Sequence, residues 1–262
     1  MITLHPDQLQ QWLLQLFWPF VRIGACFMVA PLFGAAMVPA RVRVVLAAAI
    51  AALICPLLPA LPPVSPLSAA GLMITVEQVL IGVALGFCLQ LAFDAVNLGG
   101  QMLANSMGLS FAFNLDPQRG GASSTPALGQ LFTLLVMLTF LGLDGHTKLL
   151  EALVHSFATL PVAAGGLGAA GLEGVVGFGS HLFSGALAIA LPGLTALLIV
   201  HLGFGVVSRA APALNLFAVG LPLSLLCGLL IVLAALTAVQ SSFIEGLEQA
   251  FRMIASLTGA QG

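Results

Sequence analysis

Long, nearly uninterrupted apolar runs restrict what this chain can fold into more than any other feature. Only 6% of the 262 residues are charged, 60% are hydrophobic, and the mean hydropathy is +1.14. Soluble globular domains carry about 25% charged residues, so this chain cannot build a water-facing surface. The runs are continuous rather than alternating, which favours helices over a membrane β-barrel. The sequence therefore predicts an all-α, polytopic integral membrane protein that forms a single domain over residues 1–262.

The longer apolar runs are interrupted by prolines and end at turn signals. Pro19 and Pro31 lie within the first run and Pro192 lies within a later one. Because an interior proline removes a backbone donor and kinks a helix, we expect kinked and broken helices and hairpins. The glycine-rich stretch 163–179 is expected to be a connector. The helical runs are expected at residues 9–38, 44–58, 69–98, 127–143, 146–160, 181–207 and 219–239.

The C-terminal stretch 241–258 differs from the apolar runs because it mixes charged and apolar residues. Ser242 and Glu245 have the spacing of a capping box. One face of the resulting helix would carry Phe243, Leu247, Phe251 and Ile254. This pattern predicts an amphipathic C-terminal helix that lies at an interface or docks on a partner.

The polar stretch 105–126, NSMGLSFAFNLDPQRGGASSTP, interrupts the apolar sequence and predicts a central loop. Met107, Leu109, Phe111 and Phe113 recur at every second position, so an extended segment would place them on one side. Irregular backbone at membrane depth persists only where it is buried in protein or lines a cavity. The apolar edge of this loop must therefore touch protein, lipid or a pore.

Three charged residues, Arg22, Glu77 and Asp94, lie within apolar runs. A charge at membrane depth is costly, so each is expected to have a partner or to face water. They could belong to a proton or ion relay, but structural ion pairs or assembly contacts are the preferred interpretation. Glu77 and Asp94 are about 25 Å apart along one helix at 1.5 Å per residue, so they cannot share a site unless the helix folds back.

The sequence offers no catalytic, metal or cofactor site. His146, His155, His181 and His201 are too widely spaced for a local ligand pair, and the four cysteines lie far apart in apolar runs. Nucleophile-elbow and phosphate-loop motifs are absent. The net charge of −2 is too small to indicate nucleic-acid binding. We therefore expect a protein that is not an enzyme.

Several motifs resemble the FliR family of flagellar type III export-gate subunits. The first block comprises GLSFA at 108–112, Asp116-Pro117, Pro126, Gly145-His146 and SFATLP ending at Pro161. The second block, residues 190–228, places Arg209, Pro212 and Pro222 where similar family residues lie. The resemblance covers most of the chain.

The resemblance implies a subunit of a multi-pass pore complex in the bacterial inner membrane at the flagellar basal body. FliP-like and FliQ-like subunits would join it, a FlhB-like subunit would pack around it, and unfolded polypeptides would pass through. It also implies that the central loop plugs the closed channel, through Met107, Gly108, Leu109, Ser110, Phe111, Phe113, Asp116 and Pro117. Arg22, Glu77, Asp94 and Arg209 would make ion pairs or assembly contacts.

Two alternatives remain open. The chain could be the equivalent subunit of a virulence type III secretion system. It could also be a self-contained secondary transporter for a small solute, although such transporters are built from internal repeats, and no clear repeat is visible here.

Overall fold

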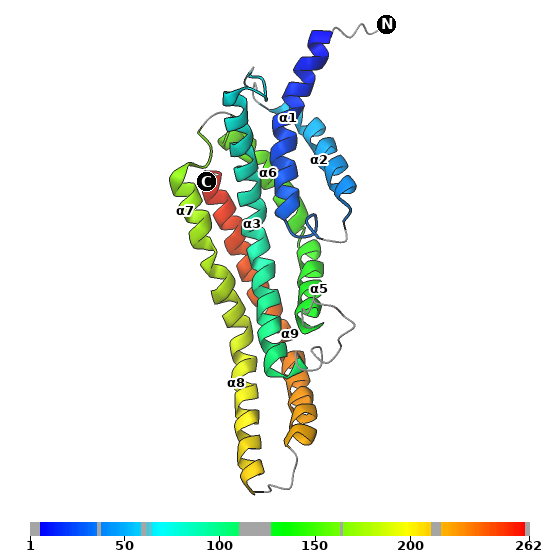
Figure 1. The fold of residues 1–262 in the computed structure, drawn as a ribbon, viewed down its shortest axis with the longest axis vertical. Coiled ribbons are helices and arrows are strands. Elements are labelled where there is room, and N and C mark those ends of the chain that lie inside the picture. The colour runs from blue at the N-terminus through cyan, green and yellow to red at the C-terminus, as the bar shows by residue number, and fades with distance from the viewer. Residues whose placement is uncertain are drawn as a thin grey trace. The chain divides into compact units, whose positions relative to one another are not determined.

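A computed structural model describes residues 6–35, 38–58, 62, 64–109, 127–162, 165–210 and 216–259, without the side chains of residues 6–14 and 216–219. The elements over these residues are all helical (Figure 1), which confirms the predicted all-α class. They are α1 (Pro6–Val29), α2 (Ala40–Ile54), the 3-10 turn η1 (Cys55–Leu57), α3 (Ala69–Ser106), α5 (Ala127–Gly142), α6 (Gly145–Thr159), α7 (Gly168–Phe178), α8 (Ser180–Ala210) and α9 (Leu216–Leu257).

Four helical stretches within the described residues are long and apolar enough to cross a membrane. They are Ala40–Leu57, Ala69–Ser106, Gly168–Ala210 and Gly220–Leu257. Helices α5 and α6 are bent at the break between them, and the pair can count as a fifth, broken span. The multi-pass organisation predicted from the apolar runs is therefore confirmed.

The first apolar run ends earlier than expected because of Pro31. The residue before a proline is disfavoured in the helical region, and α1 accordingly stops at Val29. The chain then turns through Leu32, whose φ of 71° is left-handed. Arg43 of α2 holds this turn, since its Nη2 donates to the carbonyls of Ala35 (2.7 Å) and Val38 (2.9 Å).

The glycine-rich stretch expected to be a connector instead contains a helix, α7. Two of its glycines lie against α9: a Cβ atom added at Gly174 would be 3.0 Å from Met253 Cε, and one at Gly171 would be 3.7 Å from Leu257 Cδ2. Close packing of this kind offsets the low helix propensity of glycine.

The expected separate helix at 241–258 is instead the last part of α9, which continues without a break. Ser241 Oγ donates back to the carbonyl of Ala238 (3.0 Å), as a serine inside a helix does. Phe243, Leu247 and Ile254 are all buried. The apolar face predicted for this stretch therefore packs within the chain's own fold.

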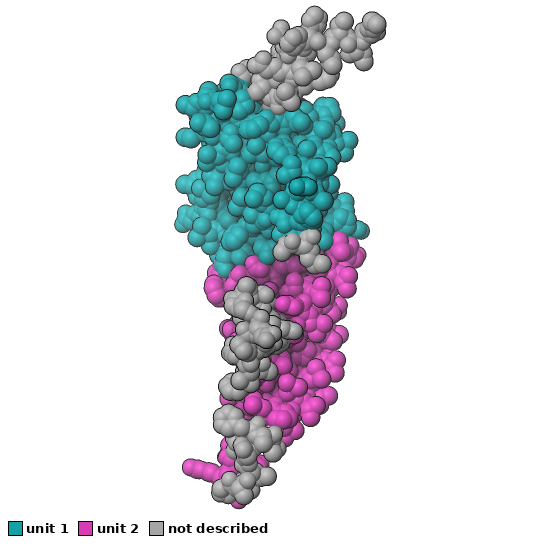
Figure 2. All heavy atoms as spheres, turned by 45° about the vertical axis from the view of Figure 1, so that its right-hand side comes forward, with its two compact units in different colours: residues 1–91, 144–179, 249–262 teal, residues 92–143, 180–248 magenta. Residues whose placement is uncertain are grey.

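The chain divides into two compact units (Figure 2). Unit 1 comprises residues 1–91, 144–179 and 249–262, and unit 2 comprises residues 92–143 and 180–248. In unit 1, α1 lies so close to α3 that a Cβ atom at Gly86 would be 2.7 Å from the carbonyl oxygen of Cys26. In unit 2, Phe93 makes edge-on contacts with Phe140 (5.4 Å between ring centroids) and Phe243 (5.0 Å).

Candidate functional site

The central loop was predicted from residue 105, but α3 continues to Ser106 in unit 2, so the chain leaves the helix at Met107. Met107 is buried, with 3% of its surface exposed, and its backbone nitrogen donates to the carbonyl of Leu103 (3.0 Å). Gly108 follows with a left-handed φ of 78°. A glycine in this conformation is a common way to end a helix because it has no Cβ to clash. The turn therefore fixes the direction in which the chain leaves α3.

The structure describes only the first part of the predicted plug. Leu109 is half-buried next to Gly108. Ser110, Phe111, Phe113, Asp116 and Pro117 lie outside the described residues. Their role in closing a channel stays a prediction.

Arg22 is the centre of a buried polar cluster in unit 1, formed by Arg22, Gln78, Ser156, Phe157 and Leu160. The Arg22 side chain is 0% exposed. Its Nε donates to Gln78 Oε1 (2.8 Å), and its Nη1 donates to the carbonyl (2.9 Å) and hydroxyl (3.1 Å) of Ser156. Its Nη2 donates to the carbonyl of Leu160 (2.8 Å). The guanidinium also lies over the Phe157 ring, 4.2 Å from the ring centroid.

These contacts make Arg22 a cap for the C-terminal end of α6. The last turn of a helix leaves carbonyls without intrahelical donors, and a cation there is favourable. Helix α6 has no basic residue in its own last turn. Arg22 of α1 supplies the cation instead, and Gln78 of α3 orients it. The four acceptors described for Arg22 are neutral oxygens, so the cluster joins three helices by hydrogen bonds.

Glu77, the residue before Gln78, holds the segment that follows α6. Its carboxylate accepts from the backbone nitrogen of Gly165 (3.1 and 3.2 Å) and from that of Gly166 (3.4 Å). Two adjacent residues of α3 therefore act on neighbouring parts of the chain. Gln78 binds Arg22, which caps the end of α6, and Glu77 binds the segment after α6 directly. This arrangement gives Glu77 a structural role within the chain.

Asp94 and Arg209 lie elsewhere. Asp94 is half-buried on α3 in unit 2. Because α3 is continuous, Glu77 and Asp94 are about 25 Å apart along its axis and do not form one site. Arg209 is exposed in the last turn of α8. Assembly contacts by these two residues stay a prediction.

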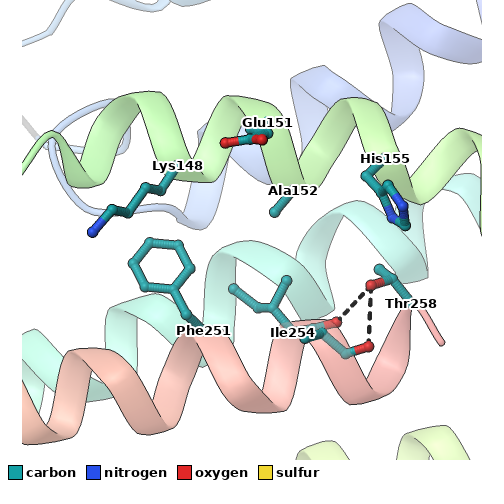
Figure 3. Close-up of a pocket in the computed structure, with 8 residues that line it drawn as sticks. Lys148, Glu151, Ala152, His155, Phe251, Ile254 and Thr258 are labelled. Carbon is teal, nitrogen blue, oxygen red and sulfur yellow. Dashed lines mark hydrogen bonds between the residues drawn. The ribbon is translucent and has the colours of Figure 1, made fainter. Parts of the chain in front are cut away.

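A pocket of about 220 Å³ lies between α6 and the end of α9 in unit 1. Figure 3 shows Phe251 and Ile254 pointing from α9 toward a row on α6 that carries Lys148, Glu151 and His155. This row carries both a positive charge (Lys148) and a negative charge (Glu151), so its charge favours neither a cation nor an anion. Among the residues that the structure describes, no three His, Cys, Asp or Glu side chains gather as a metal site requires.

The sequence reasoning missed Gln78 and Ser156 as partners of Arg22. Gln78 could have been noticed as a second polar residue inside an apolar run. Ser156 could not have been identified from the sequence, because it lies 134 residues away from Arg22 along the chain.

The fold and the buried polar cluster define the chain as a multi-pass helical membrane protein. Residues 13–250 match the family described as bacterial export proteins, family 1, and the chain belongs to this family. It is 37% identical over 258 residues to the flagellar biosynthetic protein FliR of Escherichia coli K12, covering 98% of this chain and 97% of that protein.

Two further relatives carry the same name. The FliR of Pectobacterium carotovorum is 35% identical over 230 residues, covering 88% of this chain and 87% of the relative. The FliR of Bacillus subtilis is 30% identical over 224 residues, covering 84% and 85%. The chain is thus a multi-pass membrane subunit of the flagellar export apparatus, in a family of export proteins rather than enzymes. These findings confirm the predicted family and the flagellar assignment.

Proposed function

We propose that this chain is a pore and gate subunit that forms, with FliP-like and FliQ-like subunits, the channel through which unfolded flagellar proteins cross the inner membrane. A FlhB-like subunit packs around this complex. The family supports the export context, and the resemblance described above supports the partners.

The observation that carries the proposal is the apolar surface of α8 and α9 in unit 2. Phe183 and Ile199 of α8 are each 70% exposed, and Leu230 of α9 is 67% exposed. Surfaces of this kind must be covered by lipid or by other apolar helices, and the export context of the family favours helices of other subunits. Covering α8 and α9 with other apolar helices would make this chain one wall of a larger assembly.

Co-purification tests the assembly. Expressed with FliP-like and FliQ-like proteins, the chain should purify with both; expressed alone, it should be degraded or aggregate in mild detergent. Ile199→Asn should reduce co-purification, whereas Ser184→Asn, at an exposed polar position of the same helix, should not. A monodisperse and thermally stable chain on its own would contradict the proposal that it needs these partners.

We further propose that the central loop closes the resting channel. Large apolar side chains in a narrow passage exclude water and ions by dewetting, and flexible Met and Phe side chains can yield to a passing polypeptide. In this role Leu109, Phe111 and Phe113 supply the apolar edge, and Asp116-Pro117 shape the far end of the loop.

Ion leak through the assembled complex tests the plug. Removing residues 108–116, or changing Phe111 and Phe113 to Ala, should leave assembly normal and increase ion conductance or sensitivity to high salt. A normally assembled complex that stays ion-tight after the deletion would refute the plug. Failure to assemble would show instead that the loop is needed for packing.

A further inference from the structure

We infer that Leu221, Ser224 and Gly228 of α9 form a seat that positions Met107 and Gly108, and through them the point at which the predicted plug leaves α3. This inference rests on the proposed plug. It concerns only described residues of unit 2, and it assigns Met107 to anchoring rather than to the surface that closes the channel.

The closest contact in the seat joins Met107 to Gly228. A Cβ atom added at Gly228 would overlap Met107 Cγ and would lie 2.7 Å from Cε and 2.8 Å from Sδ. Contacts below 3.0 Å are not tolerated without displacement of one partner. An alanine at position 228 would therefore force the flexible Met107 side chain to shift, whereas glycine leaves the space in which Met107 is buried.

Two more residues of α9 complete the seat on the same face. Positions 221, 224 and 228 follow the three- and four-residue spacing that places side chains in line along a helix. Ser224, which is buried, has its Oγ within hydrogen-bond distance of the Met107 carbonyl (3.4 Å) and also donates to the Leu221 carbonyl (3.0 Å). A Cβ at Gly108 would lie 2.9 Å from Leu221 Cδ2, so Leu221 closes the seat over the left-handed glycine.

The preceding turn of α3 is also held by a glycine contact. A Cβ at Gly193 of α8 would lie 2.5 Å from Leu103 Cδ2, and Leu103 is one turn before Met107. Since Leu103 fits against α8 and Met107 against α9, the end of α3 has little freedom to slide or rotate. Helix α9 therefore supports the turn at Met107 and Gly108.

The neighbouring Gly220 shows that a glycine on α9 does not by itself imply such a contact. A Cβ at Gly220 would meet nothing within 4 Å. Gly220 and Gly228 lie on the same helix, so an alanine at either position changes backbone freedom similarly. A difference between the two variants therefore reports the contact with Met107.

Disulfide cross-linking tests the geometry directly. In the assembled complex, with Cys26, Cys55, Cys88 and Cys227 replaced by Ala, the pair Met107→Cys and Gly228→Cys should form an intramolecular disulfide on mild oxidation. The control pair Met107→Cys and Leu229→Cys should not, because Leu229 is half exposed and points away from this face. Equal cross-linking of both pairs, or none in the first, would overturn the seat.

Ion leak tests whether the seat matters for closure. Gly228→Ala should assemble normally and raise the leak several-fold over Gly220→Ala, because the added methyl displaces Met107. Adding Met107→Ala to Gly228→Ala should lower the leak again, since it removes the atoms in conflict and keeps the contact of Ser224 with the Met107 backbone carbonyl. An ion-tight Gly228→Ala complex would overturn the positioning role.

The outcomes separate the seat from the plug. If removal of residues 108–116 causes leak but Gly228→Ala does not, the plug stands and the seat is refuted. If the deletion is ion-tight while the double variant Met107→Cys with Gly228→Cys still cross-links, the plug is refuted and the seat remains as a packing contact without a role in closure. Gly228→Ala could also prevent assembly. In that case, recovery of both assembly and low ion leak on adding Met107→Ala supports the seat, and absence of recovery refutes it.

Discussion

Arg22→Met is the most informative substitution in unit 1 because it removes the guanidinium but retains an apolar side chain of similar length. It eliminates the four hydrogen bonds of Arg22. Gln78 Oε1 and the Leu160 carbonyl then lose their described donor, whereas the Ser156 carbonyl still accepts from the Leu160 nitrogen (2.9 Å). A buried acceptor left without a donor costs roughly 1–3 kcal/mol. The Leu160 carbonyl is only part-buried and costs less, so the two acceptors together cost about 3 kcal/mol.

Part of this cost is offset, because methionine does not carry the desolvation penalty of a buried cation. We therefore expect a net loss of about 2–3 kcal/mol. One kcal/mol lowers the melting temperature of a chain this size by about 2–4 °C, so the assembled complex should melt about 5–10 °C lower. The measurement is size-exclusion chromatography of the detergent-solubilised complex after heating.

Arg41→Met is the matched control, since Arg41 is exposed on α2 in the same unit. Arg22→Lys should not restore stability, because a single ammonium cannot reach the acceptors on α3 and α6 that the planar guanidinium spans. The double variant Arg22→Met with Gln78→Met should lose less than the sum of the two single variants. If Arg22→Met melts within about 2 °C of Arg41→Met, a difference worth less than about 1 kcal/mol, the cluster does not stabilise the fold as argued.

Two smaller predictions concern Glu77 and Asp144. Glu77→Gln should accelerate hydrogen exchange at the Gly165 and Gly166 amides, because glutamine keeps only one acceptor oxygen and loses the negative charge. Unchanged exchange would show that Glu77 does not hold this segment. Asp144 has a left-handed φ of 54° and no side-chain cap bond, so Asp144→Gly should raise the melting temperature slightly and Asp144→Val should lower it. The opposite order would contradict strain at this residue.

Apolar periodicity predicted most helices of this chain but not all of their ends. It placed α5 and α6 within a residue or two, because Asp144 and Gly145 interrupt the apolar pattern. It ended α3 at residue 98, whereas the helix continues to Ser106 through Gly99, Gly100 and polar residues. There Gly99 lies against Ile189 and Gly100 against Gly129, so tertiary packing overrides local propensity.

The candidate sites were predicted only in part. Arg22 was identified because a charge in an apolar run is conspicuous, but its partners lie on other helices and depend on the fold. Met107 was grouped with the loop by its two-residue alternation with Leu109, and its burial against Gly228 is visible only in three dimensions. Gly228 sits inside an unbroken apolar run, where one glycine among 29 gives no indication of its contact.

Glycines pack closely against neighbouring helices in both units, and in unit 1 the hydrogen-bonded cluster around Arg22 adds to this packing. The cluster and the glycine contacts should respond differently to substitution. Helices in an apolar environment gain little from burial alone, so close packing and hydrogen bonds must supply specificity. In unit 1, Arg22 supplies bonds to two other helices, and loss of the donor cannot be compensated by any smaller side chain. In unit 2, Leu103 and Met107 fill spaces left by Gly193 and Gly228, so an enlarged glycine can be compensated by shortening its partner. These contacts predict two different outcomes. Shortening a neighbouring side chain should not rescue the Arg22 variants, whereas Met107→Ala should rescue Gly228→Ala.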